Sequence, residues 1–386
     1  MHCPVLPEMR RGLIGGSLIL SLLLAGCGDN KAAAAPGALA VIVGAHSNMV
    51  APSLLGTVKD EIGAASELGS PATVIVDDGN PRASAPLSLS PANDNQLIRQ
   101  DQLDQFRNLI GKTRADNPEV DLLAALALAA RSVSDAAGPK TIVVIDSGLQ
   151  TTGALRFQDQ GGALLNADPD EVVDQLRRTQ QLPNLTGMRV VFTGLGDTAA
   201  PQQPLPTPAR AVLVALWTKI VTSAGGKPEV KQTPLPSTRT LSGLPPVTIV
   251  PVAAQSIGPL PSITVLRDGT VGFVPGQAVF REPDQARTVL ADYAKAIKNG
   301  KKALLTGTTA SDGTPEYRFQ LSAKRADAVR DLLISLGAPA DQISTRGVGS
   351  DFPGYVPDRD QQGNLNPIPA AQNRQVIIEL GPGEPK

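Results

Sequence analysis

Short, mainly apolar runs alternate with amphipathic stretches over the first 225 residues of the chain. The runs occupy residues 39–43, 72–76, 141–145 and 189–193. Runs of this length, rich in Val and Ile and without polar alternation, indicate strands buried on both faces, as in a parallel sheet. Residues 119–134, 170–180 and 209–223 have the apolar spacing of helices. The alternation predicts an α/β domain over residues 39–226, with a mostly parallel sheet flanked by helices.

Proline recurs at short intervals between residues 227 and 262. Proline interrupts helices and is disfavoured in central strands, so this stretch predicts a semi-rigid linker. Beyond it, residues 282–299 and 315–336 have helical spacing, residues 302–306, 342–348 and 375–380 favour strands, and residues 271–280 favour a strand and a turn. We expect a second, smaller α/β domain with a mixed sheet over residues 263–382. Residues 354–372 are polar and contain proline, which predicts a long exposed loop suited to contact with a partner or glycan.

Charge and residue counts exclude several kinds of function. The 35 basic and 36 acidic residues give a net charge of −1, so the chain as a whole has no electrostatic reason to bind nucleic acid. Two Cys and two His cannot form a zinc finger or a Cys/His metal cluster. We therefore expect no metal, no cofactor and no catalysis.

The first 27 residues carry the features of an export signal. Arg10 and Arg11 precede an apolar run, residues 12–25, which is shorter than the roughly 20 residues of a spanning helix. The run ends in Leu24-Ala25-Gly26-Cys27, which resembles the cleavage site of a bacterial lipoprotein signal peptide. The resemblance implies a signal peptide over residues 1–26, acylation of Cys27 with fatty chains such as palmitate, and a tether over residues 27–38. It places the protein in the cell envelope, anchored to a membrane; the alternative is an ordinary N-terminal helix with a buried Cys.

The first domain resembles the von Willebrand factor A family. Residues 40–49 stand where that family has a strand followed by Asp-x-Ser-x-Ser, and residues 141–148 where it has a strand ending in Asp-Gly. Gly44, His46 and Asn48 replace the Asp and the two Ser, so the oxygen ligands that a hard cation needs are missing. We expect Asp146 to cap the loop that follows its strand. We expect His46 to be a loop residue bonded to backbone, because the adjacent His46-Ser47 pair does not specify triad geometry.

The second domain resembles the OmpA-like peptidoglycan-binding domain. Residues 307–313 (Gly-Thr-Thr-Ala-Ser-Asp-Gly) resemble its Gly-His-Thr-Asp-x-x-Gly loop. Residues 321–329 resemble its Leu-Ser-x-x-Arg-Ala-x-x-Val helix, and residues 373–376 (Asn-Arg-Gln-Val) its closing Asn-Arg-Arg-Val. In that family an Asp pairs the ammonium of diaminopimelate in the peptide stem, and an Arg pairs the carboxylate. The resemblance implies peptidoglycan-binding roles for Arg325, Asp312, Ser322, Thr309, Asn373 and Arg374.

Two charged residues of that site are missing here, and one of them is the second Arg of the closing motif, which is replaced by Gln375. Ala310 stands at the position of the Asp, and Asp312 in the same loop is a candidate to replace it. Two hypotheses follow. The chain is a non-catalytic lipoprotein that links a membrane to peptidoglycan, its first domain binding an unknown protein. Alternatively, the peptidoglycan site is degenerate, Arg325 forms an ion pair with Asp312 or Asp351, and the chain is an envelope scaffold.

Overall fold

The computed structural model describes residues 35–52, 56–89, 91, 95–232, 234–235, 240–252, 260–267 and 271–381. The predicted signal peptide, Cys27 and most of the tether lie outside these ranges. Among the described residues, none of the helices combines the length and the apolar character needed to cross a membrane.

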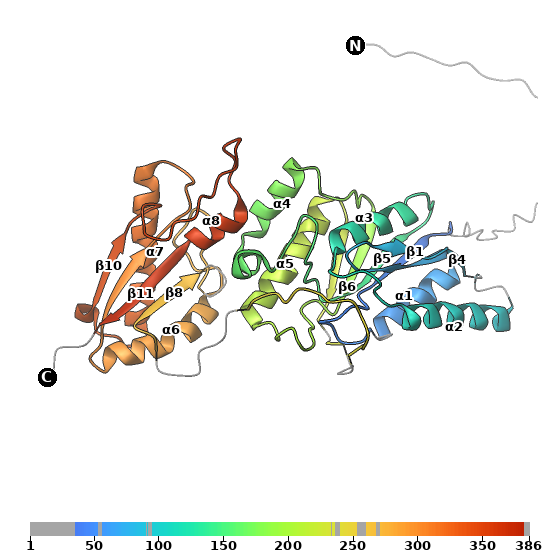
Figure 1. Ribbon diagram of the computed structural model, residues 1–386, viewed down its shortest axis with the longest axis horizontal. Helices are drawn as coiled ribbons and strands as arrows, with labels where there is room; N and C mark the ends of the chain where they lie inside the picture. Colours follow the sequence, from blue (N-terminus) through green and yellow to red (C-terminus); the bar gives the residue numbers. More distant parts are fainter. Residues whose placement is uncertain are drawn as a thin grey trace, which may run out of the picture. The chain divides into compact units, whose positions relative to one another are not determined.

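The first sheet has seven strands, and its centre is parallel (Figure 1). Its order is β3-β2-β1-β5-β6-β7, with β4 also paired to β2. The parallel strands are β1 (Ala38–Val43), β2 (Pro71–Val76), β5 (Lys140–Ile145), β6 (Met188–Thr193) and β7 (Lys227–Lys231). The short strands β3 (Arg82–Ala83) and β4 (Leu87–Ser88) run antiparallel to β2. The predicted parallel-rich sheet is confirmed.

Helices cover both faces of this sheet. Alternate residues of β1 point to opposite faces, so Leu39 and Val41 belong to one apolar core, and Ala40 and Ile42 to the other. The first core includes side chains of α1 (Gly56–Glu67) and α2 (Gln96–Lys112). The second includes α3 (Leu122–Val133), α4 (Pro169–Arg178) and α5 (Thr207–Ser223), with the short 3-10 helices η1 (Asp159–Gly161) and η2 (Ala163–Asn166) preceding α4.

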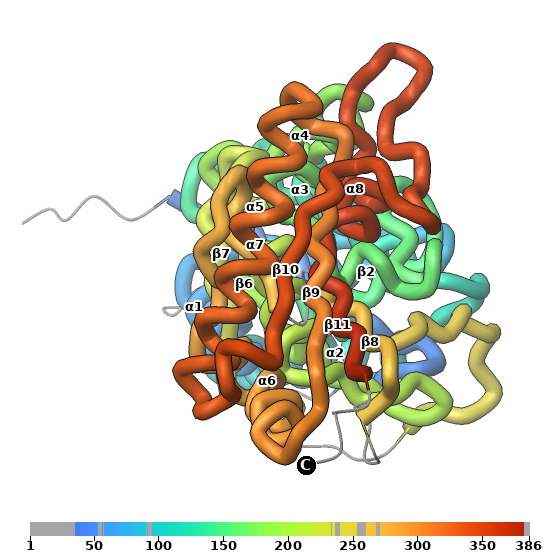
Figure 2. The backbone as a smooth tube through the Cα atoms, turned by 90° about the vertical axis from the view of Figure 1, so that its left-hand side faces the viewer, coloured from blue at the N-terminus to red at the C-terminus, as the bar shows by residue number. Residues whose placement is uncertain are grey.

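The second sheet is smaller and mixed, as predicted. Figure 2 shows its four strands side by side in the order β10-β9-β11-β8. They are β8 (Ile263–Arg267), β9 (Lys302–Gly307), β10 (Ile343–Gly347) and β11 (Gln375–Gly381). Strands β9 and β10 are parallel, whereas β11 runs antiparallel to both β9 and β8. Helices α6 (Pro283–Lys298) and α7 (Pro315–Ser335) close the core of this sheet, and η3 (Ala340–Gln342) leads into β10.

Glycine lets α7 approach the second sheet closely. A Cβ atom at Gly307 would lie 2.0 Å from the carbonyl oxygen of Ser322, and one at Gly347 would lie 2.3 Å from the backbone nitrogen of Ala323. Both distances are far below van der Waals contact, so neither position accepts a larger residue without moving the helix. This packing fixes the face of α7 that carries Arg325.

Three stretches differ from the sequence predictions. Residues 271–280 contain the predicted turn, which is closed by a bridge between Phe273 and Phe280, but not the predicted strand. The stretch predicted as a linker begins with β7, which pairs with β6 at the edge of the sheet. Pro228 is tolerated in this strand because proline lacks a backbone N–H, and an edge strand has a neighbour on one side only. Residues 354–372 are not simply an exposed loop, because they contain most of α8 (Pro367–Asn373), whose Ala370 and Ala371 are fully buried.

Candidate functional site

The carboxyl edge of the first sheet is filled by a buried ion pair. His46 Nε2 lies 2.9 Å from Asp146 Oδ2, and His46 Nδ1 lies 2.6 Å from the carbonyl oxygen of Ser47. Burial by itself would lower the pKa of His46, but the Asp146 carboxylate and the Ser47 carbonyl outweigh it and raise that pKa. Asp146 Oδ1 also accepts from the Gly148 N–H at 2.6 Å, so the predicted loop cap is confirmed.

This edge offers neither a metal site nor a nucleophile. A Cβ at Gly44 would lie 1.8 Å from Asp146 Oδ2, so a side chain at this position would displace the Asp146 carboxylate from its place beside His46. The Ser47 hydroxyl donates to the carbonyl of Pro245 at 3.0 Å, and His46 contacts only the carbonyl of that serine. Asn48 Nδ2 donates to the carbonyl of Val247, so residues 245–247 lie across the edge. In the described part of the chain, no three His, Cys, Asp or Glu residues are grouped to hold a metal.

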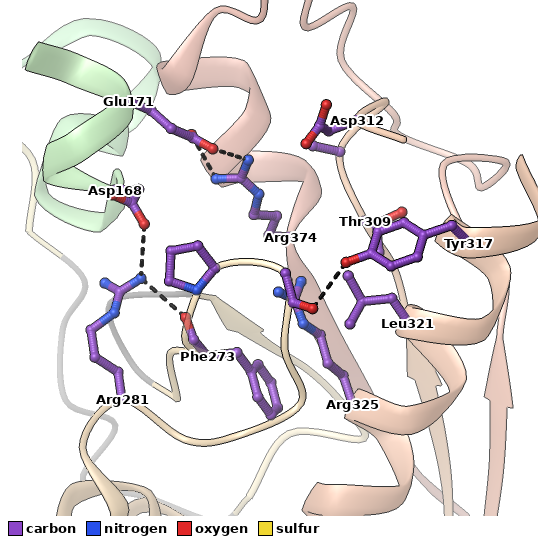
Figure 3. A pocket seen from close by; sticks show the side chains of 13 residues that line it. Asp168, Glu171, Phe273, Arg281, Thr309, Asp312, Tyr317, Leu321, Arg325 and Arg374 are labelled. Atoms are coloured by element: carbon purple, nitrogen blue, oxygen red, sulfur yellow. Dashed lines mark hydrogen bonds and ion pairs between the residues drawn. The ribbon is translucent and has the colours of Figure 1, made fainter. Parts of the chain in front are cut away.

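The second half of the chain contributes a charged pocket, which we call the arginine pocket (Figure 3). Its members come from the 273–281 loop, the loop after β9, α7, the residue between α8 and β11, and the N-cap and first turn of α4. They are Asp168, Glu171, Phe273, Pro275, Gly276, Arg281, Thr309, Ala310, Asp312, Tyr317, Leu321, Arg325 and Arg374. Three guanidinium groups and three carboxylates therefore line one cavity.

Arg325 lies at the buried base of this pocket. Its side chain is 3% exposed, its Nε donates to the carbonyl of Gln277 at 3.0 Å, and its guanidinium carbon lies 5.2 Å from the centre of the Phe273 ring. The stacking and the hydrogen bond hold the guanidinium plane in one orientation, which favours binding of a planar carboxylate through parallel hydrogen bonds. The 273–281 loop, interpreted as a strand and a turn from sequence, is thus the segment that positions this residue.

The loop after β9 forms the opposite wall. The Thr309 N–H donates to the carbonyl of Gly349 at 2.8 Å, and its buried hydroxyl oxygen has no hydrogen-bond partner among the described residues. Ala310 is buried beside it and presents a methyl group in place of the family carboxylate. Asp312 also lines the pocket, but it is 74% exposed and lies 3.8 Å from Arg359 Nη2. The loop therefore contributes Thr309 and Ala310 to the pocket lining, while the side chain of Asp312 lies mainly in solvent.

A buried carboxylate that the sequence analysis missed holds this loop in place. Asp358 accepts hydrogen bonds from the Ser311 N–H at 2.9 Å, the Ser311 hydroxyl, the Tyr355 hydroxyl at 2.7 Å and Asn373 Nδ2 at 3.0 Å. Burial by itself would raise the pKa of Asp358, but these donors outweigh it and lower that pKa. Its position inside a polar stretch interpreted as an exposed loop gave no signal in the sequence.

Two predicted site residues pack beside the pocket instead of lining it. Ser322 is fully buried, its hydroxyl donates to the Phe319 carbonyl and it accepts from the Gly349 N–H. Asn373 is 1% exposed, and its amide bonds both backbone groups of Val356 besides Asp358. These contacts make both residues supports of the loops around the pocket.

Arg374 lines the pocket and binds an acidic residue from α4. Its guanidinium forms two hydrogen bonds with the Glu171 carboxylate, one of them at 2.7 Å (Figure 3). One turn earlier, Asp168 Oδ2 lies 3.7 Å from Arg281 Nη2. Asp168 was not identified from the sequence, because nothing local indicates that α4 lies against a loop more than 100 residues later.

Comparison with known proteins identifies the second half. Residues 272–363 match the model of the OmpA family, so the chain carries an OmpA family domain in its C-terminal part. The sodium-type flagellar protein MotY of Vibrio parahaemolyticus is 36% identical over 93 residues, which make up 24% of this chain and 29% of that protein. The peptidoglycan-associated lipoprotein of Pasteurella multocida is 42% identical over 55 residues, 14% of this chain and 37% of that protein. Both relatives are therefore matched over less than half of their own length.

The comparison with solved structures includes another protein of this name. The crystal structure of the peptidoglycan-associated lipoprotein from Burkholderia pseudomallei is similar at a TM-score of 0.25 and 26% identity, covering 30% of this chain and 89% of that chain. The predicted resemblance of residues 263–382 to the OmpA-like domain is thus confirmed over residues 272–363.

Proposed function

We propose that this chain binds the peptidoglycan of a bacterial cell envelope through the arginine pocket, and that it does so without catalysis. The observation that carries the proposal is the buried, oriented Arg325 in the pocket of an OmpA family domain. A guanidinium in such a site binds a carboxylate strongly, because the charge-assisted hydrogen bonds form away from bulk water. The carboxylate of diaminopimelate in the stem peptide is the ligand group that suits it.

The remainder of the chain suits an anchoring role. We propose that Cys27 is acylated after removal of residues 1–26, which would attach the protein to a membrane on the extracytoplasmic side. The first domain would be a von Willebrand factor A-like module that binds another protein. Its parallel sheet with helices on both faces supports this interpretation, and its buried His46–Asp146 pair replaces the metal site of that family.

A specific observation keeps a second function open. Ala310 leaves the loop after β9 without the carboxylate that pairs the ligand ammonium in the family. A degenerate pocket of this kind would make the chain an envelope scaffold that binds proteins through both domains.

Cosedimentation of the purified protein with peptidoglycan sacculi distinguishes the two functions. We expect the wild-type protein to pellet, and Arg325→Ala to weaken binding by about tenfold to a hundredfold, since a hydrogen bond to a charged group contributes about 1.5–3 kcal/mol. Arg330→Ala is the matched control, because Arg330 lies on the same helix but is paired with Asp331 and Asp327 at the surface. Wild-type protein that stays in the supernatant would refute peptidoglycan binding and favour the scaffold.

A further inference from the structure

We propose that the arginine pocket is shared between the two halves of the chain, and that Asp168 of α4 supplies the ammonium-binding carboxylate that Ala310 cannot. This inference rests on the proposed function and assigns a ligand-binding residue outside the OmpA family domain. The ligand is an amino-acid end group that carries both an ammonium and a carboxylate.

Asp168 is buried and one of its oxygens has unused hydrogen-bonding capacity. Its side chain is 5% exposed, and Oδ1 accepts from the Asp170 N–H at 2.9 Å as the cap of α4. Oδ2 lies 3.7 Å from Arg281 Nη2, which is beyond hydrogen-bond distance, and no hydrogen bond to it is found in the described part of the chain. A ligand ammonium that donates to this oxygen would therefore add a charge-assisted hydrogen bond that the chain itself does not make.

The ion pair one turn further along α4 holds Asp168 at the pocket. Glu171 and Arg374 face each other through two hydrogen bonds, and their side chains are only 25% and 13% exposed. Asp168 and Glu171 lie three residues apart at the start of the same helix, so they face the same side of it (Figure 3). We assign Glu171 the role of a positioning residue and Asp168 that of a ligand-binding residue.

The charge of the pocket supports a zwitterionic ligand. Arg281, Arg325 and Arg374 would by themselves attract any small anion, and Asp312 is mostly in solvent. With Asp168 and Glu171, the pocket has three carboxylates and three guanidinium groups, so its charges balance. A balanced pocket has little net attraction for a simple anion and favours a ligand that presents opposite charges in the right order.

The experiment compares two stem peptides that differ only in the side-chain amino group of diaminopimelate, one with this group unmodified and one with it acetylated. Binding is measured by calorimetry on the full chain. We expect Asp168→Asn, which keeps the helix cap, to weaken binding of the unmodified peptide by about tenfold and to leave the acetylated peptide unaffected. The matched control is Asp174→Asn, because Asp174 lies on the same helix and pairs with Arg177 at the surface. Glu171→Gln should weaken binding of the unmodified peptide as well.

The outcomes separate the inference from the proposed function. If Asp168→Asn binds both peptides as tightly as the wild type does, while Arg325→Ala loses binding as expected, the shared pocket is refuted and the proposed function stands. Tighter binding by Asp168→Asn or Glu171→Gln would also refute it, because α4 would then act as a cover over the pocket. A wild-type protein that binds neither the peptides nor sacculi would refute the proposed function itself.

Discussion

Replacing Asp358 by alanine tests how the pocket is supported. The substitution removes the acceptor shared by Ser311, Tyr355 and Asn373. Asn373 is 1% exposed, so water cannot replace the lost acceptor, whereas Ser311 and Tyr355 are partly exposed. A buried donor left without a partner costs about 1–3 kcal/mol, and partly exposed ones less. We therefore expect a loss of about 3 kcal/mol in the free energy of unfolding, together with weaker binding to sacculi.

The pH dependence gives an independent check on the same residue. Because the folded protein lowers the pKa of Asp358, its stabilising effect is complete above the ordinary range of a carboxyl group. It is lost as the pH falls through the lowered value. Urea unfolding of the wild-type and Asp358→Ala proteins should therefore show a difference that narrows in strong acid.

The control is Asp351→Ala, which removes an exposed carboxylate from a neighbouring loop and should change stability by less than about 0.5 kcal/mol. If Asp358→Ala unfolds at the wild-type urea concentration and still pellets with sacculi, the reasoning about this buried acceptor is wrong.

Three further substitutions test the packing and the buried charges. Gly347→Ala would place a Cβ 2.3 Å from the nitrogen of Ala323, and should lower the unfolding free energy by about 2 kcal/mol or more in urea. Asp77→Asn should raise the melting temperature at neutral pH, because burial and neighbouring carboxylates, Asp146 first, raise the pKa of Asp77 well above its usual range; a lower melting temperature would contradict this. The stabilisation from the raised pKa of His46 is complete below that group's ordinary pKa and is lost as the pH rises through the folded value. The melting temperature should therefore fall with rising pH in the wild type, and should fall much less in Asp146→Asn.

The sequence predicted the elements whose pattern is decided locally. The apolar runs at β1, β2, β5 and β6 are buried on both faces, and this doubly buried environment is why they show no polar alternation. By contrast, α2 buries only Phe106 and Ile110 among 17 residues and exposes Leu97, so its apolar stripe was too sparse to recognise. Helix α8 begins with Asn-Pro, a normal helix start, but two prolines in seven residues favoured a loop.

The residues of the candidate site also differ in whether the local sequence identifies them. Arg325 and Thr309 could be found because they lie in segments that resemble the OmpA family in order. Asp168 could not, since its distance from Arg281 depends on how α4 lies against a loop far along the chain. Asp358 was hidden for a related reason: the donors that justify its burial come from three separate segments.

The order of strands in the second sheet has a consequence for biogenesis. Strand β11 lies between β9 and β8, so β8 has no partner in this sheet until residues 375–381 have been made. During translation and export, the 263–374 segment would expose the apolar edges that β11 later covers. Premature stop codons between residues 308 and 374, after β8 and β9 have been made, should therefore give chains prone to aggregation and proteolysis, instead of shortened but folded proteins.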